Sequence, residues 1–234
     1  MRVYLCGQKA FGAAAFEAIR HAGHEIVGVS APMWSERESD RPDRLRACAD
    51  MSGVPFLPAG MLCADLLPGG TDLIIAAHSH DFIGRETRLR APIGAIGYHP
   101  SLLPRHRGRD AVRWAIRLRD PIAGGTVYWL SNNVDAGDIA AQDWCWVRPD
   151  DTADSLWRRE LFPMGLRLLS AVLDDLSAGV RVAIPQDEDL ATWEPSWSRP
   201  PLRRPDLLML GDGRSAPGLR TVRETLADRS RRSC

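Results

Sequence analysis

Four residues that could carry chemistry stand at the end of an apolar run or in the loop of a β-rich pair: His78, His80, His99 and Asp135. Histidine and aspartate transfer protons in many enzymes, and histidine also binds metal ions. Taken singly, a histidine here can be a packing or capping residue, and Asp135, which precedes an Ala-Gly pair, can be a turn aspartate. Together they favour a catalytic site, provided that the fold brings them to one place.

The runs that precede these residues are typical of buried strands. Five runs are short and mostly apolar: residues 2–6, 24–31, 53–58, 71–78 and 94–99. Segments with helical character at 13–22 and 44–51 lie between them, and strands that alternate with helices predict right-handed βαβ crossovers. We therefore predict a doubly wound, mostly parallel α/β sheet. In such a sheet the loops after the strands meet at one edge, where ligands bind.

The second half of the chain adds further elements to this sheet. We expect a helix over 110–118, an antiparallel hairpin formed by 123–130 and 139–147, and a long helix over 151–179. This divides the chain into an α/β domain, residues 1–185, and an extended C-terminal segment rich in Pro and Trp, residues 186–234. The polar, Arg-rich end of that segment is expected to be mobile.

Composition narrows the class of protein. Thirty basic and thirty acidic residues give a formal net charge of zero, which does not favour a nucleic acid or a membrane as partner. The five cysteines have no C-x-x-C spacing and predict reduced thiols in a cytoplasmic protein. Gln8, Lys9 and Glu17 interrupt the apolar N-terminus, so we interpret it as strand, loop and helix instead of a signal peptide.

Two motifs carry a family resemblance. "HPSLLPRHRG" (99–108), followed by "TVYWLSNNVDAGDIAAQ" (126–142), resembles the folate-dependent formyltransferases, which include glycinamide ribonucleotide formyltransferase and the catalytic domain of methionyl-tRNA formyltransferase. The resemblance covers roughly residues 1–150. It implies a Rossmann-like fold and transfer of a formyl group from 10-formyltetrahydrofolate to an amine of a small metabolite. Position by position, His99 matches the family's catalytic histidine and Asp135 its catalytic aspartate.

The implied reaction suits these two side chains. An amine attacks the formyl carbon, negative charge develops on the formyl oxygen, and protons move from the amine to the folate nitrogen. A histidine donor can stabilise that oxygen, typically by about 2.7–4 kcal/mol. A nearby carboxylate favours the protonated imidazole and can organise the water that moves protons.

The resemblance also implies ligand contacts. The loops after the fourth strand and before Asp135 are expected to bind the folate: His80, Asp81, Phe82, Ile83, Leu130, Ser131, Asn132, Asn133 and Val134. Phe82 can equally be a core residue. The amine substrate is expected near a second set: Gly7, Gln8, Lys9, Ser101 and Arg107. No metal site is expected.

One position departs from the family pattern. The family has an asparagine two residues before the catalytic histidine, where this chain has Gly97. Loss of one such hydrogen-bond donor costs about 10²–10³ in rate. By sequence, His80 and Asn133 are the nearest candidates to replace it. Alternatively, Gly97 makes room for a bulkier substrate group.

Other interpretations stay open. Water could replace the amine, which would make the protein a hydrolase of 10-formyltetrahydrofolate, or the loss of the asparagine could leave a catalytically impaired folate-binding protein. A metal hydrolase built on His78, His80 and His99 is a further alternative, because H-x-H on a strand places two imidazoles on one face. A tRNA substrate is not expected, since few residues follow the long helix. The sequence indicates neither the amine nor the oligomeric state.

Overall fold

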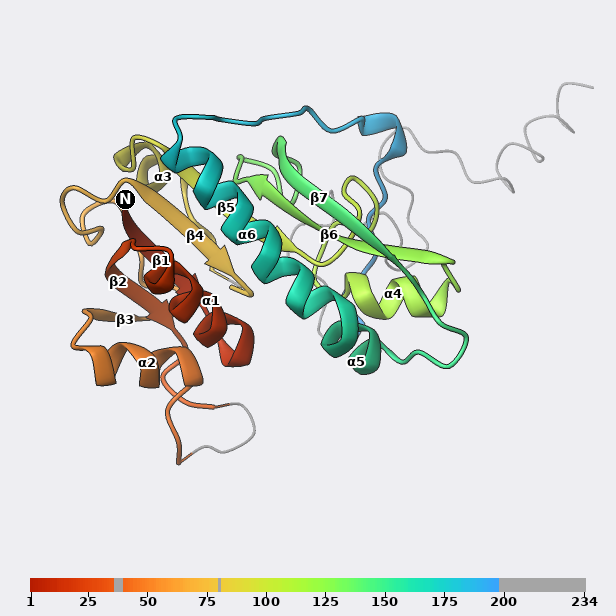
Figure 1. Cartoon of the computed structure of the whole chain (residues 1–234), viewed down its shortest axis with the longest axis horizontal. Helices are drawn as coiled ribbons and strands as arrows, with labels where there is room; N and C mark the ends of the chain where they lie inside the picture. Colours follow the sequence, from red (N-terminus) through yellow and green to blue (C-terminus); the bar gives the residue numbers. More distant parts are fainter. Residues whose placement is uncertain (36–39, 80, 198–234) are drawn as a thin grey trace, which may run out of the picture.

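Seven strands form one sheet in the order β3-β2-β1-β4-β5-β6-β7 (Figure 1). The computed structural model describes residues 1–35, 40–79 and 81–197. The strands are β1 (Arg2–Gly7), β2 (Glu25–Ala31), β3 (Phe56–Pro58), β4 (Leu73–Ala77), β5 (Gly94–His99), β6 (Ile122–Trp129) and β7 (Ile139–Trp146). The first five are parallel, and β6 pairs antiparallel with both β5 and β7. The predicted sheet with its added hairpin is confirmed.

Helices cover both faces of the sheet. They are α1 (Lys9–His21), α2 (Arg44–Ser52), α3 (Arg85–Arg90), α4 (Ala111–Arg117), α5 (Ala153–Leu156) and α6 (Phe162–Ser177), with a π-helical turn η1 (Trp157–Leu161) and a 3₁₀ turn η2 (Glu188–Leu190). In Figure 1, α1 and α6 lie side by side across the same face. None of the helices in the described part of the chain is long and apolar enough to cross a membrane.

Burial on both faces explains the apolar runs. Along β1, Val3 and Leu5 pack in the core beneath α1 and α6, whereas Tyr4 and Cys6 pack in a second core on the opposite face. A strand buried on both sides has no polar alternation, as expected for the centre of a parallel sheet. The cysteines that the structure describes are free thiols, and Cys234 lies outside the described residues.

Three elements differ from expectation. Helix α1 begins at Lys9 instead of residue 13, since Phe11 already belongs to its buried face. Helix α3 has a polar sequence in which only Thr87 is buried, so the sequence has no apolar periodicity that would predict this helix. The long helix contains η1 just before Pro163, where the N–H of Phe162 bonds to the carbonyl of Trp157, five residues back. Proline lacks an N–H for the ordinary α-helical bond, which favours such an irregular turn.

Candidate active site

His99 is the last residue of β5 and is only 7% exposed. Its Nε2 lies 2.7 Å from the carbonyl oxygen of His106, so this nitrogen carries a proton and donates it to the carbonyl. The other nitrogen, Nδ1, lies 3.6 Å from Oδ2 of Asp135, beyond an ordinary hydrogen bond. One nitrogen therefore fixes the ring, and the other faces a carboxylate.

Asp135 lies in the turn between β6 and β7 with a φ of 51°, a left-handed conformation that aspartate tolerates better than most residues. Both carboxylate oxygens accept hydrogen bonds. Oδ1 accepts from the Tyr128 hydroxyl at 2.6 Å, and Oδ2 accepts from the Gly108 N–H at 2.8 Å. The structure thus brings the predicted pair, His99 and Asp135, together and orients the carboxylate. Sequence reasoning did not single out Tyr128.

The loop after His99 is held by its own hydrogen bonds. The Thr126 hydroxyl, opposite His99 on β6, donates to the Ser101 carbonyl and accepts from the Leu103 N–H. The Ser101 hydroxyl donates to the carbonyl of Arg105 at 2.6 Å, and Ser101 is 4% exposed. The expected substrate contact through Ser101 stays a prediction, and in this structure its hydroxyl bonds within the loop.

His106 is a buried histidine between two carboxylates. Nε2 lies 2.7 Å from Asp120 Oδ2, and Nδ1 lies 2.9 Å from Glu194 Oε1. Burial opposes the charged imidazole, but Glu194 and Asp120 outweigh it and raise the pKa of His106. Because the carbonyl of this residue accepts the His99 proton, the ion pairs also hold the partner of the candidate catalytic histidine.

The raised pKa of His106 predicts a pH-dependent stability. Below its unfolded value of about 6.5 the imidazole is charged in both states, so its contribution is fully present. As pH rises through the higher folded-state pKa, the contribution is lost. We expect the Tm to fall as the pH rises above about 6.5 and through the raised folded-state pKa of His106, and to fall less in His106→Gln. Equal pH dependence of the two proteins in a thermal melt would contradict this.

Residues 186–197, which we call the C-terminal strap, reach both parts of the site. Gln186 donates to the carbonyls of Asp135 and Gly137, at 2.9 and 2.7 Å. The guanidinium of Arg107 makes four hydrogen bonds to Gln186 and Glu188. In Figure 1 the blue chain after α6 crosses the end of the sheet before it turns down toward α4. The expected extended segment packs on the domain, whereas residues 198–234, including the end expected to be mobile, lie outside the described residues.

Arg107 was also expected to contact the amine substrate, and that contact stays a prediction. In this structure its side chain is 2% exposed and ion-paired with Glu188 of the C-terminal strap. Its guanidinium also lies over the ring of Trp193. Arg107 therefore anchors the strap to the loop that follows His99.

Comparisons with known proteins bear on the family of the chain. Residues 62–172 match the family profile described as formyl transferase. The chain is 33% identical over 204 residues to the cytosolic 10-formyltetrahydrofolate dehydrogenase of Mus musculus, covering 83% of this chain and 22% of that protein. It is 35% identical over 202 residues to the methionyl-tRNA formyltransferase of Anaeromyxobacter sp. (strain K), covering 82% and 64%. The chain belongs to the folate-dependent formyltransferase family.

A solved structure shows the same formyltransferase fold. The N-formyltransferase of Helicobacter canadensis, in complex with folinic acid and dTDP-3-aminofucose, superposes with a TM-score of 0.67 at 14% identity, covering 82% of this chain and 70% of that one. The chain spans about a fifth of the length of the dehydrogenase relative, 22%, so only that part of the longer protein is comparable.

The two loops expected to bind folate lie together. The Arg88 guanidinium on α3 donates to the Ile83 carbonyl and to Oδ1 of Asn132. Phe82 is 76% exposed, so it is a surface residue and not part of the core. Asp81 is partly buried, and burial raises the pKa of its carboxyl. His80 lies outside the described residues.

The rest of the second folate loop is polar and mostly open. Ser131 forms a local turn in which its hydroxyl bonds to the backbone of Asn133, while Asn133 and Val134 are exposed. Leu130, half-buried, packs against the core on the Tyr4 face. Backbone groups and apolar side chains from two adjacent loops suit a flat, polar-edged pterin ring. The residues present therefore fit a folate.

The first loop holds a carboxylate of the chain itself. The backbone N–H of Lys9 donates to both oxygens of Asp43, at 3.1 and 2.8 Å, and Asp43 also caps α2. Gln8 is 4% exposed, and a Cβ on Gly7 would lie 2.5 Å from the Ala77 carbonyl oxygen. This tight loop was expected to contact the amine, and it already contains a negative charge.

Gly97, where the family has asparagine, lies directly opposite Tyr128 in the β5–β6 pair. A Cβ there would lie 3.1 Å from Leu130 Cδ2 and 3.3 Å from Tyr128 Cε1. The space beside Gly97 is thus occupied by neighbouring side chains. Leu130 and Tyr128 fill the space that a side chain at position 97 would take. Their packing disfavours a bulkier substrate group at that point.

We therefore expect Gly97→Asn to lower stability by about 1–3 kcal/mol, because overpacking displaces the Tyr128 ring. Activity should not rise. Thermal melts and turnover of Gly97→Asn, with Gly97→Ala as the smaller control, check this. An Asn variant with unchanged Tm and higher activity would show that the position is open after all.

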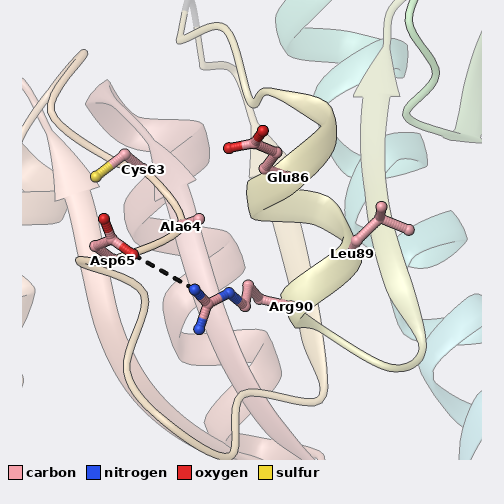
Figure 2. A pocket seen from close by; sticks show the side chains of 6 residues that line it. All are labelled: Cys63, Ala64, Asp65, Glu86, Leu89 and Arg90. Atoms are coloured by element: carbon pink, nitrogen blue, oxygen red, sulfur yellow. Dashed lines mark hydrogen bonds and ion pairs between the residues drawn. The ribbon is translucent and has the colours of Figure 1, made fainter.

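Two cavities in the described part of the chain are bounded by residues other than His99 and Asp135. One of about 380 Å³ is bounded by Cys63, Ala64, Asp65, Glu86, Leu89 and Arg90 (Figure 2), with an Asp65–Arg90 ion pair at 3.4 Å. None of these residues was predicted to belong to the site. A second cavity, of about 200 Å³, lies beside the His106 ring and Asp120, behind the loop that follows His99.

Metal binding was considered from the histidines. Across residues 1–35, 40–79 and 81–197, no three His, Cys, Asp or Glu side chains are grouped so that they could hold a metal ion. The ring of His78 instead lies 5.8 Å from that of Trp157.

Proposed function

We propose that this protein binds 10-formyltetrahydrofolate and transfers its formyl group to an amine of a small metabolite. The observation that carries the proposal is the buried His99–Asp135 pair at the carboxyl edge of the sheet. A donor and a carboxylate, each held by separate hydrogen bonds, are the two groups that this transfer requires.

The geometry supports separate roles for the two side chains of the pair. The folate supplies an electrophilic formyl carbon and a leaving nitrogen. His99 Nε2 is committed to the His106 carbonyl, so Nδ1 is the nitrogen left to donate to the formyl oxygen as its negative charge develops. Asp135 takes the proton from the attacking nitrogen, through water, and returns it to the leaving nitrogen as that carbon–nitrogen bond breaks.

The folate would lie between the loops joined by Arg88. Backbone groups of residues 81–83 and 130–134 would bind the polar edges of the pterin, and Leu130, which is partly buried, would offer apolar contact. This placement rests on the adjacency of the two loops to each other and to His99.

A second candidate is hydrolysis, in which water replaces the amine. The contact between Asp43 and the Lys9 N–H favours it over transfer to a phosphorylated amine. The Asp43 carboxylate accepts the hydrogen bond of the Lys9 N–H at the start of α1, where a bound anion would otherwise accept it. Its negative charge also repels a second anion. An uncharged acceptor such as water, or an unphosphorylated amine, suits this loop better.

The test is release of tetrahydrofolate from 10-formyltetrahydrofolate, measured without amine, with pooled unphosphorylated amines and with pooled phosphorylated amines. His99→Ala serves as the blank. Release that depends on an amine pool establishes the transferase, and release without amine establishes the hydrolase. No release in any condition, with folate bound, would contradict the proposal and favour the impaired binding protein.

A further inference from the structure

Tyr128 contacts the catalytic carboxylate directly. Its hydroxyl donates to Asp135 Oδ1 at 2.6 Å, a short bond of the kind formed with a charged acceptor. The residue is 8% exposed and pairs with Gly97 in the β5–β6 ladder. A buried strand residue therefore presents a donor to an oxygen of a turn residue.

Gly97 makes this arrangement possible. It faces Tyr128 across the two strands, and directly opposed side chains in an antiparallel pair approach closely. With no side chain at Gly97, the Tyr128 ring lies where even a Cβ would be 3.3 Å from Cε1. A larger residue at 97 would push the ring, and with it the hydroxyl, away from its present position.

The groups around the Asp135 carboxylate come from three segments. Tyr128 on β6 bonds Oδ1, the Gly108 N–H bonds Oδ2, and His99 Nδ1 at the end of β5 faces the same Oδ2. Tyr128 is the only one of these three described neighbours that contacts Oδ1. Burial, together with the charge and hydrogen bond of Asp135, raises the pKa of Tyr128, so its hydroxyl stays protonated and remains a donor.

We infer that Tyr128 is a positioning residue of this enzyme, which locks the rotation of the Asp135 carboxylate so that Oδ2 faces His99. This inference rests on the proposed function for its catalytic consequence. Loss of the hydroxyl frees Oδ1, and the carboxylate then turns away from the orientation that serves His99. Binding of the folate does not use the hydroxyl, so the effect falls on kcat and not on KM.

The experiment combines Tyr128→Phe and Asp135→Asn, singly and together, with Tyr4→Phe as the matched control. Tyr4 is also buried, and its hydroxyl forms a hydrogen bond with Ser30 at 3.0 Å. Tyr4 lies on β1, which β4 and β5 separate from β6 in the sheet. We expect Tyr128→Phe to lower kcat about tenfold at unchanged KM for 10-formyltetrahydrofolate, since a hydrogen bond to a charged group is lost. In the Asp135→Asn background the same change should have little effect, and Tyr4→Phe should keep the wild-type kcat.

An equal loss of kcat from Tyr128→Phe in the wild-type and Asp135→Asn backgrounds would show that Tyr128 acts only through packing and not through Asp135. An unchanged kcat in Tyr128→Phe would also overturn the inference. NMR of the His99 ring, assigned by its loss in His99→Ala, gives a second readout that needs no turnover. The His99 resonances should shift in Tyr128→Phe and not in Tyr4→Phe. If they shift while the wild type releases no tetrahydrofolate, the positioning role stands and the proposed function fails. If they stay fixed in an active enzyme, the positioning role fails.

Discussion

His99→Ala is expected to lower tetrahydrofolate release by about 10³-fold or more. The variant loses the donor to the formyl oxygen, a loss that typically costs about 10²–10³, and it also loses any part of the ring in proton transfer. The measurement is kcat with 10-formyltetrahydrofolate under the acceptor condition that supports wild-type turnover.

The fold should survive His99→Ala. The change leaves the His106 carbonyl without its 2.7 Å donor, which costs about 1–3 kcal/mol for a buried group. Circular dichroism, the Tm and binding of folinic acid report whether the variant is folded. His21→Ala, an exposed histidine on α1, is the control and should be fully active. Activity near the wild-type level in folded His99→Ala would rule out the assigned role.

Asp135→Asn is expected to lower kcat by about 10²–10⁴-fold, the usual contribution of a positioned proton-transfer group. Asparagine keeps the shape and tolerates the left-handed backbone at a φ of 51°, so the turn should persist. Its amide cannot accept hydrogen bonds on both sides. Either the Tyr128 hydroxyl or the Gly108 N–H then faces an NH₂ group instead of an oxygen.

The control for Asp135→Asn is Asp138→Asn, an exposed aspartate in the same turn. Steady-state kinetics of the two variants separate loss of the catalytic carboxylate from a general change in loop charge. If both variants lose activity to the same degree, the turn matters but Asp135 has no special role. If Asp135→Asn retains wild-type kcat, proton movement must depend on another group.

The elements that position the site could be predicted because their signals are local. Strand β5 was expected at 94–99 and is found at Gly94–His99. It could be predicted because a strand buried on both faces has an uninterrupted apolar sequence. The hairpin strands β6 and β7 lie within one residue of expectation. Helix α3 was not predicted, because it buries almost no side chain and carries no apolar period.

The sequence by itself also determined the family, through two motifs whose order and spacing are specific, and with it the candidates His99 and Asp135. It could not decide what each side chain contacts. Ser101 and Arg107 were assigned to substrate, yet both are buried against the chain itself. The sequence around a loop arginine does not differ between one that faces solvent and one that pairs with a distant acidic residue. The sequence alone therefore does not indicate whether the arginine is buried.

Only the tertiary structure decided how the pair is held. The partners of the site are far away in the sequence: Glu194 reaches His106, Gln186 reaches the Asp135 carbonyl, and Asp43 reaches Lys9. Tyr128 is near Asp135 in the chain, but its contact depends on the turn between them and on the missing side chain of Gly97. A hydrogen bond needs a distance and a direction, and those are fixed only when the sheet, the turn and the C-terminal strap are packed together. Residue types and their order therefore predicted which side chains could take part in the reaction. The packing of the folded chain decided the distances and directions between them.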